Sequence, residues 1–444
     1  MHGWFITVES FNLNYQKPAL PSERSLMKFL LIALGTRGDI EPFLAVGEML
    51  ANRGHDVTGV FPQQFEQITL DSSMEFTPMT AEFLDMIEGE IGKQALGGKG
   101  NFIQKFKAYY KLYKASKEIN RTIFKQQFEA IEALQPDKII HSIKATIPVH
   151  WGVDKPGKSI MLSPIPCVVH PIKGRSSMAF RGKDLGKLLN KWSYQFTTYA
   201  TVKNLRFYLT KLLHIKANND QKLLKSAMQN EPAIFTVSPS LINTQGLPKQ
   251  VAFLGYQERN KTRTWQPDEA LEHFLEKNQK FIFLTFGSMS NPEPVQKTKV
   301  MMDIFEQLGI PAIINTAGGG LVEPSVYNKS QFYFTSNIPY DWILPKTHAI
   351  IHHGGSGTTH LGLKYGCSSM IIPHIIDQFF WNNVLSDLGV GPKGIKIGSI
   401  SQSNLKPLVN SLWSNIDFKQ AASSIAQKMA KEDFQEELMQ ILEA

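Results

Sequence analysis

The stretch His352-His353-Gly354-Gly355-Ser356-Gly357-Thr358-Thr359 decides the fold of the second half of the chain. An apolar run, Thr347 to Ile351, predicts a strand before it, and Ser356 to Tyr365 predicts a helix after it, with Ser356 and Thr358 as candidate caps. Glycines in such a turn let a ligand approach the backbone, and a helix start offers unpaired N–H groups and the positive end of the helix dipole. We therefore expect this turn to bind an anion, most plausibly a diphosphate.

The composition is that of a globular protein with two domains. A chain of 444 residues is too long for one compact core, and its hydrophobic fraction of 42% and charged fraction of 19% are ordinary. Two cysteines, Cys167 and Cys367, suggest packing roles rather than disulfides or a Cys-rich metal site, so we expect a cytoplasmic location. No apolar run approaches the roughly 20 residues of a transmembrane helix.

Short apolar strands alternate with helices in two series, which predicts two parallel sheets. We assign residues 1–26, which lack periodicity, to a leader or disordered extension. The first domain is expected at 27–256, the second at 269–444, and the polar segment 257–268 is expected to link them.

The first domain is expected to open with a β-α-β unit. Met27 to Leu34 predicts a buried strand and Gly35 to Glu41 a loop. Pro42 suits the first position of a helix, and Val57 to Phe61 predicts the second strand. Functional loops of such units lie at the carboxyl ends of the strands.

Positive charge is concentrated between Pro171 and Asn230, where twelve Lys or Arg stand against two Asp and no Glu. This segment predicts contact with anionic lipid or with an acidic partner rather than with nucleic acid, and a set of solvated helix faces is an equal alternative. Asn101 to Leu134 predicts a long helix with alternating lysines and aromatic residues. Its aromatic side chains could lie on a membrane or, as is more common, face the core.

The second domain contains two further candidate features. Gly287 and Ser288 come after the apolar run Phe281 to Phe286, and Asp377-Gln378 supplies a carboxylate and an amide that suit sugar hydroxyls. Each feature alone could serve packing only.

Together these motifs resemble a known family. Ile350 to His360, Asp377 to Trp381 and the amino-terminal Gly35 to Pro42 resemble the family 1 inverting glycosyltransferases of the UDP-glycosyltransferase superfamily, in particular the sterol glucosyltransferases and the bacterial macrolide and glycopeptide glycosyltransferases. The resemblance implies the GT-B fold, in which two Rossmann-like domains face a central cleft. It implies an acceptor-binding first domain and a donor-binding second domain whose last helices pack back towards the first.

The resemblance also implies the roles of individual residues. The donor diphosphate is expected at Ser288, His353, Gly355, Gly357 and Thr358. The donor sugar is expected at Asp377 and Gln378. The donor base is expected near Asn337, Ile338 and Trp342. Tyr340 departs from the His or Gln usual in that segment, and His352 is expected to be structural.

Asp39 is the candidate general base, because an attacking hydroxyl must lose its proton and a carboxylate in the first loop can take it. The antibiotic and sterol subgroups place an aspartate here, whereas plant-type relatives use a histidine. Capping of the helix expected near Pro42 is an alternative role for Asp39. No Asp-x-Asp pattern precedes the donor site, so we expect no metal and no cofactor beyond the co-substrate.

The sequence thus predicts a metal-independent hexosyltransferase that moves a sugar from a UDP-sugar, expected to be UDP-glucose, to a hydroxyl of a lipophilic acceptor such as a lipid, a sterol-like molecule or a natural product. It is expected in the cytoplasm, with peripheral contact of 171–230 to anionic membrane. Two alternatives stay open: a UDP-sugar epimerase of the same fold and a non-catalytic module that binds nucleotide sugars.

Overall fold

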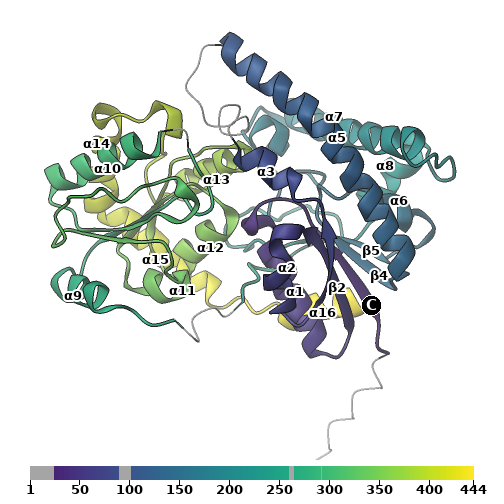
Figure 1. Cartoon of the computed structure of the whole chain (residues 1–444), viewed down its shortest axis with the longest axis horizontal. Helices are drawn as coiled ribbons and strands as arrows, with labels where there is room; N and C mark the ends of the chain where they lie inside the picture. Colours follow the sequence, from purple (N-terminus) through teal and green to yellow (C-terminus); the bar gives the residue numbers. More distant parts are fainter. Residues whose placement is uncertain (1–24, 90–101, 260–264, 292) are drawn as a thin grey trace, which may run out of the picture.

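The chain forms two α/β lobes that lie side by side (Figure 1). The computed structural model describes residues 25–89, 102–259, 265–291 and 293–444, so residues 1–24 of the expected leader lie outside it. Each lobe is built on one sheet in which all neighbouring strands pair in parallel. The predicted fold class, two parallel-sheet α/β domains, is confirmed.

The sheet of the amino-terminal lobe has seven strands in the order β3-β2-β1-β4-β5-β6-β7. The strands are β1 (Lys28–Ile32), β2 (Asp56–Pro62), β3 (Glu75–Met79), β4 (Lys138–His141), β5 (Ser159–Ser163), β6 (Ala233–Phe235) and β7 (Val251–Phe253). Alternate residues of β1 enter two separate apolar clusters, one on each face of the sheet. The sheet is therefore covered on both faces, which explains its nearly continuous apolar strands.

Helices of the amino-terminal lobe divide between these faces. The described helices are α1 (Arg37–Asn52), α2 (Glu66–Leu70), α3 (Glu82–Glu88), α5 (Phe102–Leu134), α6 (Ile147–Trp151), α7 (Lys187–Lys211) and α8 (Gln221–Asn230). Helix α1 packs on one face, and α5, α7 and α8 pack on the other. The predicted helix at 101–134 is confirmed as α5. Ile123 and Phe124 in its second half enter the core, whereas the side chains of 102–113 lie outside the described structure.

The sheet of the carboxyl-terminal lobe has five strands in the order β10-β9-β8-β11-β12. The strands are β8 (Ile282–Thr285), β9 (Ala312–Asn315), β10 (Phe332–Thr335), β11 (Ala349–His352) and β12 (Ser368–Ile371). The helices are α9 (Glu269–Lys277), α10 (Pro294–Leu308), α11 (Tyr340–Ile343), α12 (Ser356–Lys364), α13 (Ile376–Asp387), α14 (Gln402–Ser414), α15 (Ile416–Met429) and α16 (Gln435–Glu443). Within the described chain, no helix is both long and apolar enough to cross a bilayer.

One expected helix start and two expected helix caps were wrong. Helix α1 begins at Arg37, and Pro42 lies inside it rather than at its first position. The earlier start is possible because the N–H of Thr36 donates to Asp39 Oδ2 at 3.0 Å, which closes the first turn. Helix α12 begins at Ser356 with Gly355 as its N-cap, so neither Ser356 nor Thr358 is the cap.

The last helix, α16, returns to the amino-terminal lobe, as Figure 1 shows. Its side chains Leu438, Met439 and Leu442 are fully buried in the same cluster as α1. The buried ammonium of Lys138 donates to the carbonyl of Leu442 at 2.8 Å. The carboxyl-terminal helix is therefore part of the amino-terminal core.

Leu438→Ala is expected to destabilise the protein by about 2–5 kcal/mol, because it leaves a cavity in the amino-terminal core. The midpoint of thermal unfolding should fall by at least about 4 °C. The neighbouring Gln440→Ala replaces an exposed side chain and is expected to change the midpoint little. Equal midpoints for the two variants would contradict the packing of α16.

Candidate functional site

The predicted site loops lie where the strand order of each sheet reverses. In the amino-terminal sheet β1 lies between β2 and β4, and in the carboxyl-terminal sheet β8 lies between β9 and β11. From β1 the chain continues to β2 on one side, whereas from β4 it continues to β5 on the other side. The same reversal occurs between β8 and β11 in the second sheet. Open α/β sheets bind ligands at such reversal points. The loop after β1 carries Asp39, the loop after β8 carries Ser288, and the loop after β11 carries His353.

The start of α12 has the backbone geometry that suits an anion. The first helical hydrogen bond of its backbone runs from the N–H of Thr359 to the carbonyl of Gly355 at 3.0 Å. The three N–H groups before it have no acceptor within the helix, and they point along the positive end of the helix dipole. This turn contains three of the residues expected to hold the diphosphate: Gly355, Gly357 and Thr358.

His353 is buried beside this turn, and burial lowers the pKa of its imidazole to about 4, so the ring is neutral at pH 7. A Cβ atom at Gly287, whose φ is 57°, would lie 2.8 Å from the ring, and one at Gly355 would lie 2.5 Å from it. Two glycines from neighbouring loops therefore make room for the imidazole. Its Nδ1 has no hydrogen-bond partner in the described structure, so a phosphate oxygen could pair with the ring.

Tyr340, which departs from the family pattern, supports the loop after β8. Its hydroxyl lies 2.7 Å from Thr285 Oγ1, and that oxygen accepts a hydrogen bond from the N–H of Gly287 at 3.0 Å. Burial raises the pKa of the Tyr340 phenol. Gly287 lies against the His353 ring, and Ser288, the next residue of this loop, is exposed.

Asp377 and Gln378 lie in the first turn of α13. The Gln378 Oε1 atom accepts hydrogen bonds from the N–H groups of His374 and Ile375, at 2.7 and 3.1 Å. Its carbonyl oxygen therefore fixes the loop before α13, and the amide nitrogen is the atom left for a sugar hydroxyl. Asp377 is half-buried in the same turn.

Asp39 is held by contacts to both carboxylate oxygens. Oδ2 accepts from Thr36, and Oδ1 lies 2.7 Å from Lys144 Nζ in the loop after β4. A Cβ atom at Gly35, whose φ is 139°, would lie 2.0 Å from Oδ2, so the capping geometry requires glycine there. Asp39 thus caps α1 from inside its first turn, and its catalytic role stays a prediction.

Asp39 and Asp377 come from different lobes and lie within electrostatic range of each other. Burial first, and the negative charge of Asp39 second, raise the pKa of Asp377, and the Lys144 ammonium opposes the rise; the net pKa is about 6. Lys144 was missed by the sequence analysis. Its position directly after β4, which neighbours β1, is the signal that could have indicated it.

His360 joins the lobes close to the anion site. Its Nε2 accepts from the N–H of Ser238 at 3.1 Å, and its Nδ1 donates to the carbonyl of Ser356 at 2.7 Å. Burial lowers the pKa of His360 to about 4, which agrees with a neutral ring in this tautomer. The ring of Tyr256 stacks on it with centroids 5.4 Å apart. The two lobes are therefore in contact at His360, one helical turn after the start of α12.

A second contact between lobes covers α13. Phe380 and Trp381 are fully buried in a cluster that includes Cys167 of the amino-terminal lobe. At the other end of the helix, the Arg175 guanidinium lies 2.6 Å from the Asp387 carboxylate. The amino-terminal lobe thus packs directly on the helix that carries the expected sugar-binding residues.

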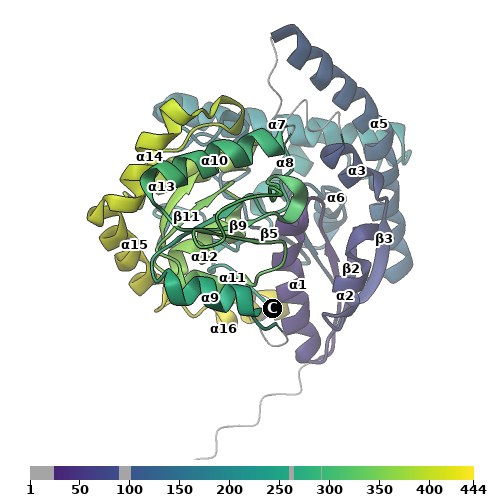
Figure 2. The same cartoon turned by 60° about the vertical axis from the view of Figure 1, so that its left-hand side comes forward.

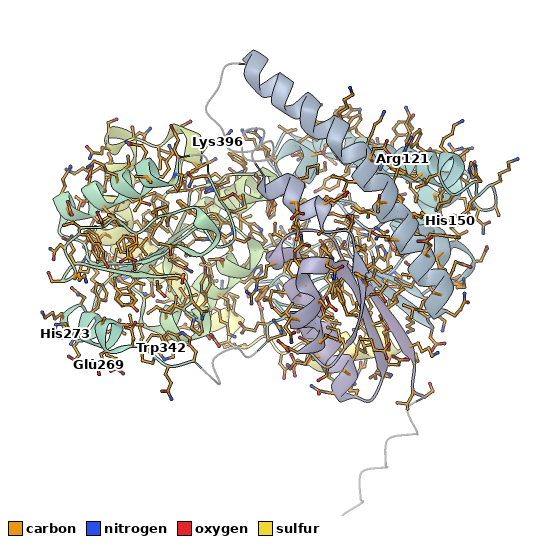
Figure 3. The ribbon with its side chains drawn as sticks, in the orientation of Figure 1. Arg121, His150, Glu269, His273, Trp342 and Lys396 are labelled. Atoms are coloured by element: carbon orange, nitrogen blue, oxygen red, sulfur yellow. The ribbon has the colours of Figure 1, made fainter. Side chains whose placement is uncertain are left out.

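The segment expected near the donor base packs mostly within its own lobe. Ile338 is buried in the core, and the carbonyl of Asn337 accepts from Trp265 Nε1 at 3.0 Å. The rings of Trp265 and Trp342 lie 4.8 Å apart, and Figure 3 labels Trp342 at the lower edge of the lobe. Trp265, in the expected linker, was not singled out from the sequence.

Two family models match separate parts of the chain. The glycosyltransferase family 28 N-terminal domain matches residues 29–152, and the erythromycin biosynthesis protein CIII-like C-terminal domain matches residues 332–444. The resemblance to family 1 glycosyltransferases is thereby confirmed. The matched parts of this glycosyltransferase-like chain carry Asp39 on one side and His353 and Asp377 on the other.

Relatives and solved structures agree with this family. A sterol 3-beta-glucosyltransferase of Arabidopsis thaliana is 27% identical and aligns with 96% of this chain and 66% of its own length. One of Saccharomyces cerevisiae is 23% identical and aligns with 95% of this chain and 35% of its own length. The chain thus spans just under two thirds of the plant relative and about a third of the yeast relative.

The fold is that of solved GT-B glycosyltransferases. The calicheamicin glycosyltransferase CalG4 superposes with a TM-score of 0.64 at 15% identity, over 94% of this chain and 98% of that one. The glycosyltransferase VinC in complex with dTDP superposes with a TM-score of 0.61 at 14% identity, over 94% and 98%. The expected GT-B fold is confirmed.

Asp377→Asn is expected to raise thermal stability near neutral pH, because it removes a partly buried carboxylate close to Asp39. The pKa of Asp377 is about 6 in the folded protein, above the ordinary 3.8. Ionised Asp377 therefore lowers the free energy of unfolding by its full amount above about pH 6, and this loss becomes smaller as the pH falls towards 3.8. The gain at about pH 8 is at most about 3 kcal/mol and should shrink towards about pH 5. Thermal unfolding at both pH values measures it.

Asp387→Asn is the matched control, because it removes a carboxylate from the same helix that forms an ion pair with Arg175. It is expected to give no gain in stability. A pH-independent effect of Asp377→Asn would contradict the raised pKa of Asp377.

Proposed function

We propose that this protein transfers a hexose from a UDP-sugar to a hydroxyl of a lipophilic acceptor, with inversion at the anomeric carbon. One observation carries the proposal: Asp39 and Asp377, from different lobes, influence each other electrostatically. Asp377 is the expected sugar ligand and Asp39 the expected base, so the two parts of a transfer reaction lie together.

In the proposed reaction, the acceptor oxygen attacks the anomeric carbon while the bond from that carbon to the diphosphate breaks. The electron pair leaves with UDP, and the hydroxyl proton passes to Asp39. Each Asp39 oxygen already accepts one hydrogen bond, and a carboxylate oxygen can accept a second. Because attack comes from the face opposite the diphosphate, an α-linked donor gives a β-glycoside.

The departing diphosphate gains negative charge, and we assign its stabilisation to the N–H groups at the start of α12, to His353 and to Ser288. These donors are fixed before reaction, so they need no reorganisation. We propose that they act without a metal ion. In the parts of the chain that are described, no three His, Cys, Asp or Glu side chains form a metal-binding group.

The donor and acceptor are proposed from relatives. Sterol 3-beta-glucosyltransferases align with nearly the whole chain, which supports UDP-glucose as donor and a sterol-like lipid as acceptor. The dTDP in the VinC structure makes dTDP-glucose the appropriate competitor in a donor screen.

Asp39→Asn is expected to lower kcat by about a hundredfold to ten-thousandfold, because the acceptor loses its general base. The amide oxygen can still accept from Thr36, so helix α1 and the Kd for UDP should be preserved. Product formation by mass spectrometry and UDP binding by calorimetry measure the two effects. Turnover close to that of the unmodified protein would rule out Asp39 as the base.

An assay without acceptor separates transfer from epimerisation. The proposal predicts that UDP-glucose incubated with the protein alone keeps its sugar configuration. Appearance of a UDP-sugar of changed configuration would instead identify an epimerase.

His353→Ala is expected to weaken UDP-glucose binding by about tenfold to a hundredfold, because a hydrogen bond to a charged phosphate is lost. Calorimetry gives the Kd. His348→Ala, which changes a half-buried histidine that contacts Trp413, is the control and should leave the Kd unchanged. An unchanged Kd for the His353 variant would count against its phosphate role.

A further inference from the structure

Helix α7 exposes a stripe of large apolar side chains on the surface of the amino-terminal lobe. Their exposed fractions lie between 46% and 83%. The stripe, here called the α7 face, consists of Leu188, Leu189, Trp192, Phe196, Tyr199 and Phe207. These positions follow the helical repeat and extend over about 28 Å of the helix.

The stripe is separate from the side of α7 that packs on the lobe. Val202, Leu205 and Leu209 are fully buried in the core beneath the helix. Helix α7 is therefore anchored by one apolar side and still presents a second one. Soluble proteins rarely expose apolar patches of this size unless the patch binds something.

The surroundings of the α7 face are positively charged. Between residues 185 and 219 the chain has six Lys or Arg and no Asp or Glu. Lys187, Lys191 and Lys203 are exposed on α7 itself. Leucine and aromatic side chains flanked by lysines are the composition of helices that lie in the interface of an anionic bilayer.

We propose that the α7 face docks this protein on the surface of an anionic phospholipid membrane. The apolar side chains enter the boundary between headgroups and acyl chains, and the lysines contact the lipid phosphates. Figures 1 and 2 show α7 along the upper edge of the molecule, where the amino-terminal end of α5 also projects.

A second copy of this chain fits the α7 face poorly. Pairing two such faces would set lysines against lysines, because the segment carries no carboxylate to meet them. An anionic surface supplies the missing opposite charge and an apolar layer at once.

The α7 face is connected to the expected sugar site by three contacts. The ring of Phe180 lies 5.6 Å from that of Trp192 and 6.2 Å from that of Phe196. The next residue, Arg181, places its guanidinium 4.7 Å from the ring of Phe379, which directly follows Asp377-Gln378. A docked membrane would thus lie beside the sugar site. Delivery of a lipid acceptor along this path rests on the proposed function, whereas docking itself does not.

Sedimentation of the full chain with phospholipid vesicles tests docking without any activity assay. We expect binding to vesicles that contain phosphatidylserine, weak binding to pure phosphatidylcholine, and a loss of binding at high salt. The double variants Leu188→Ser/Trp192→Ser and Lys187→Glu/Lys191→Glu should each weaken binding by at least about tenfold.

Matched controls use exposed side chains of the carboxyl-terminal lobe. Val326→Ser/Ile416→Ser and Lys329→Glu/Lys428→Glu should bind like the unmodified protein. Equal binding by the α7 variants and these controls would overturn the proposal, and so would salt-independent binding to neutral vesicles. Concentration-dependent dimers that the α7 variants abolish, in the absence of vesicle binding, would show that a second copy covers the face instead.

Discussion

One electrostatic constraint spans the two lobes: the carboxylates of Asp39 and Asp377 lie within interaction range of each other at a partly buried site. Asp39 and Asp377 repel each other, and burial adds to the cost of charging Asp377. Lys144 offsets part of that cost through its ion pair with Asp39. Such a charge arrangement lowers stability and is retained in proteins mainly where it serves binding or catalysis.

Keeping the carboxylates together requires firm contact between the lobes. The neutral His360 accepts a backbone hydrogen bond from Ser238, α13 is packed by the amino-terminal lobe, and α16 completes the amino-terminal core. Opening the boundary would break the hydrogen bond between Ser238 and His360 and expose Trp381 to water. Most of the stability of the site therefore comes from residues that have no chemical role in it.

Elements with strong local signals could be predicted from the sequence, and those set by tertiary contacts could not. Strand β11 and helix α12 follow from an apolar run and a glycine-rich turn. Strand β12 has two serines among its four residues and was missed, because its burial comes from its neighbours. Among site residues, Lys144 belongs to no motif, and only the order of strands brings it to Asp39.

The central claim is that Asp39 and the diphosphate site at the start of α12 act on opposite sides of one anomeric carbon in a single displacement. The most direct test is the anomeric configuration of the first glycoside that forms from UDP-α-glucose and a sterol in anionic vesicles. Proton NMR measures it through the coupling constant of the anomeric proton. A β-glycoside is predicted. An α-glycoside would contradict the single displacement and the role of Asp39 in it.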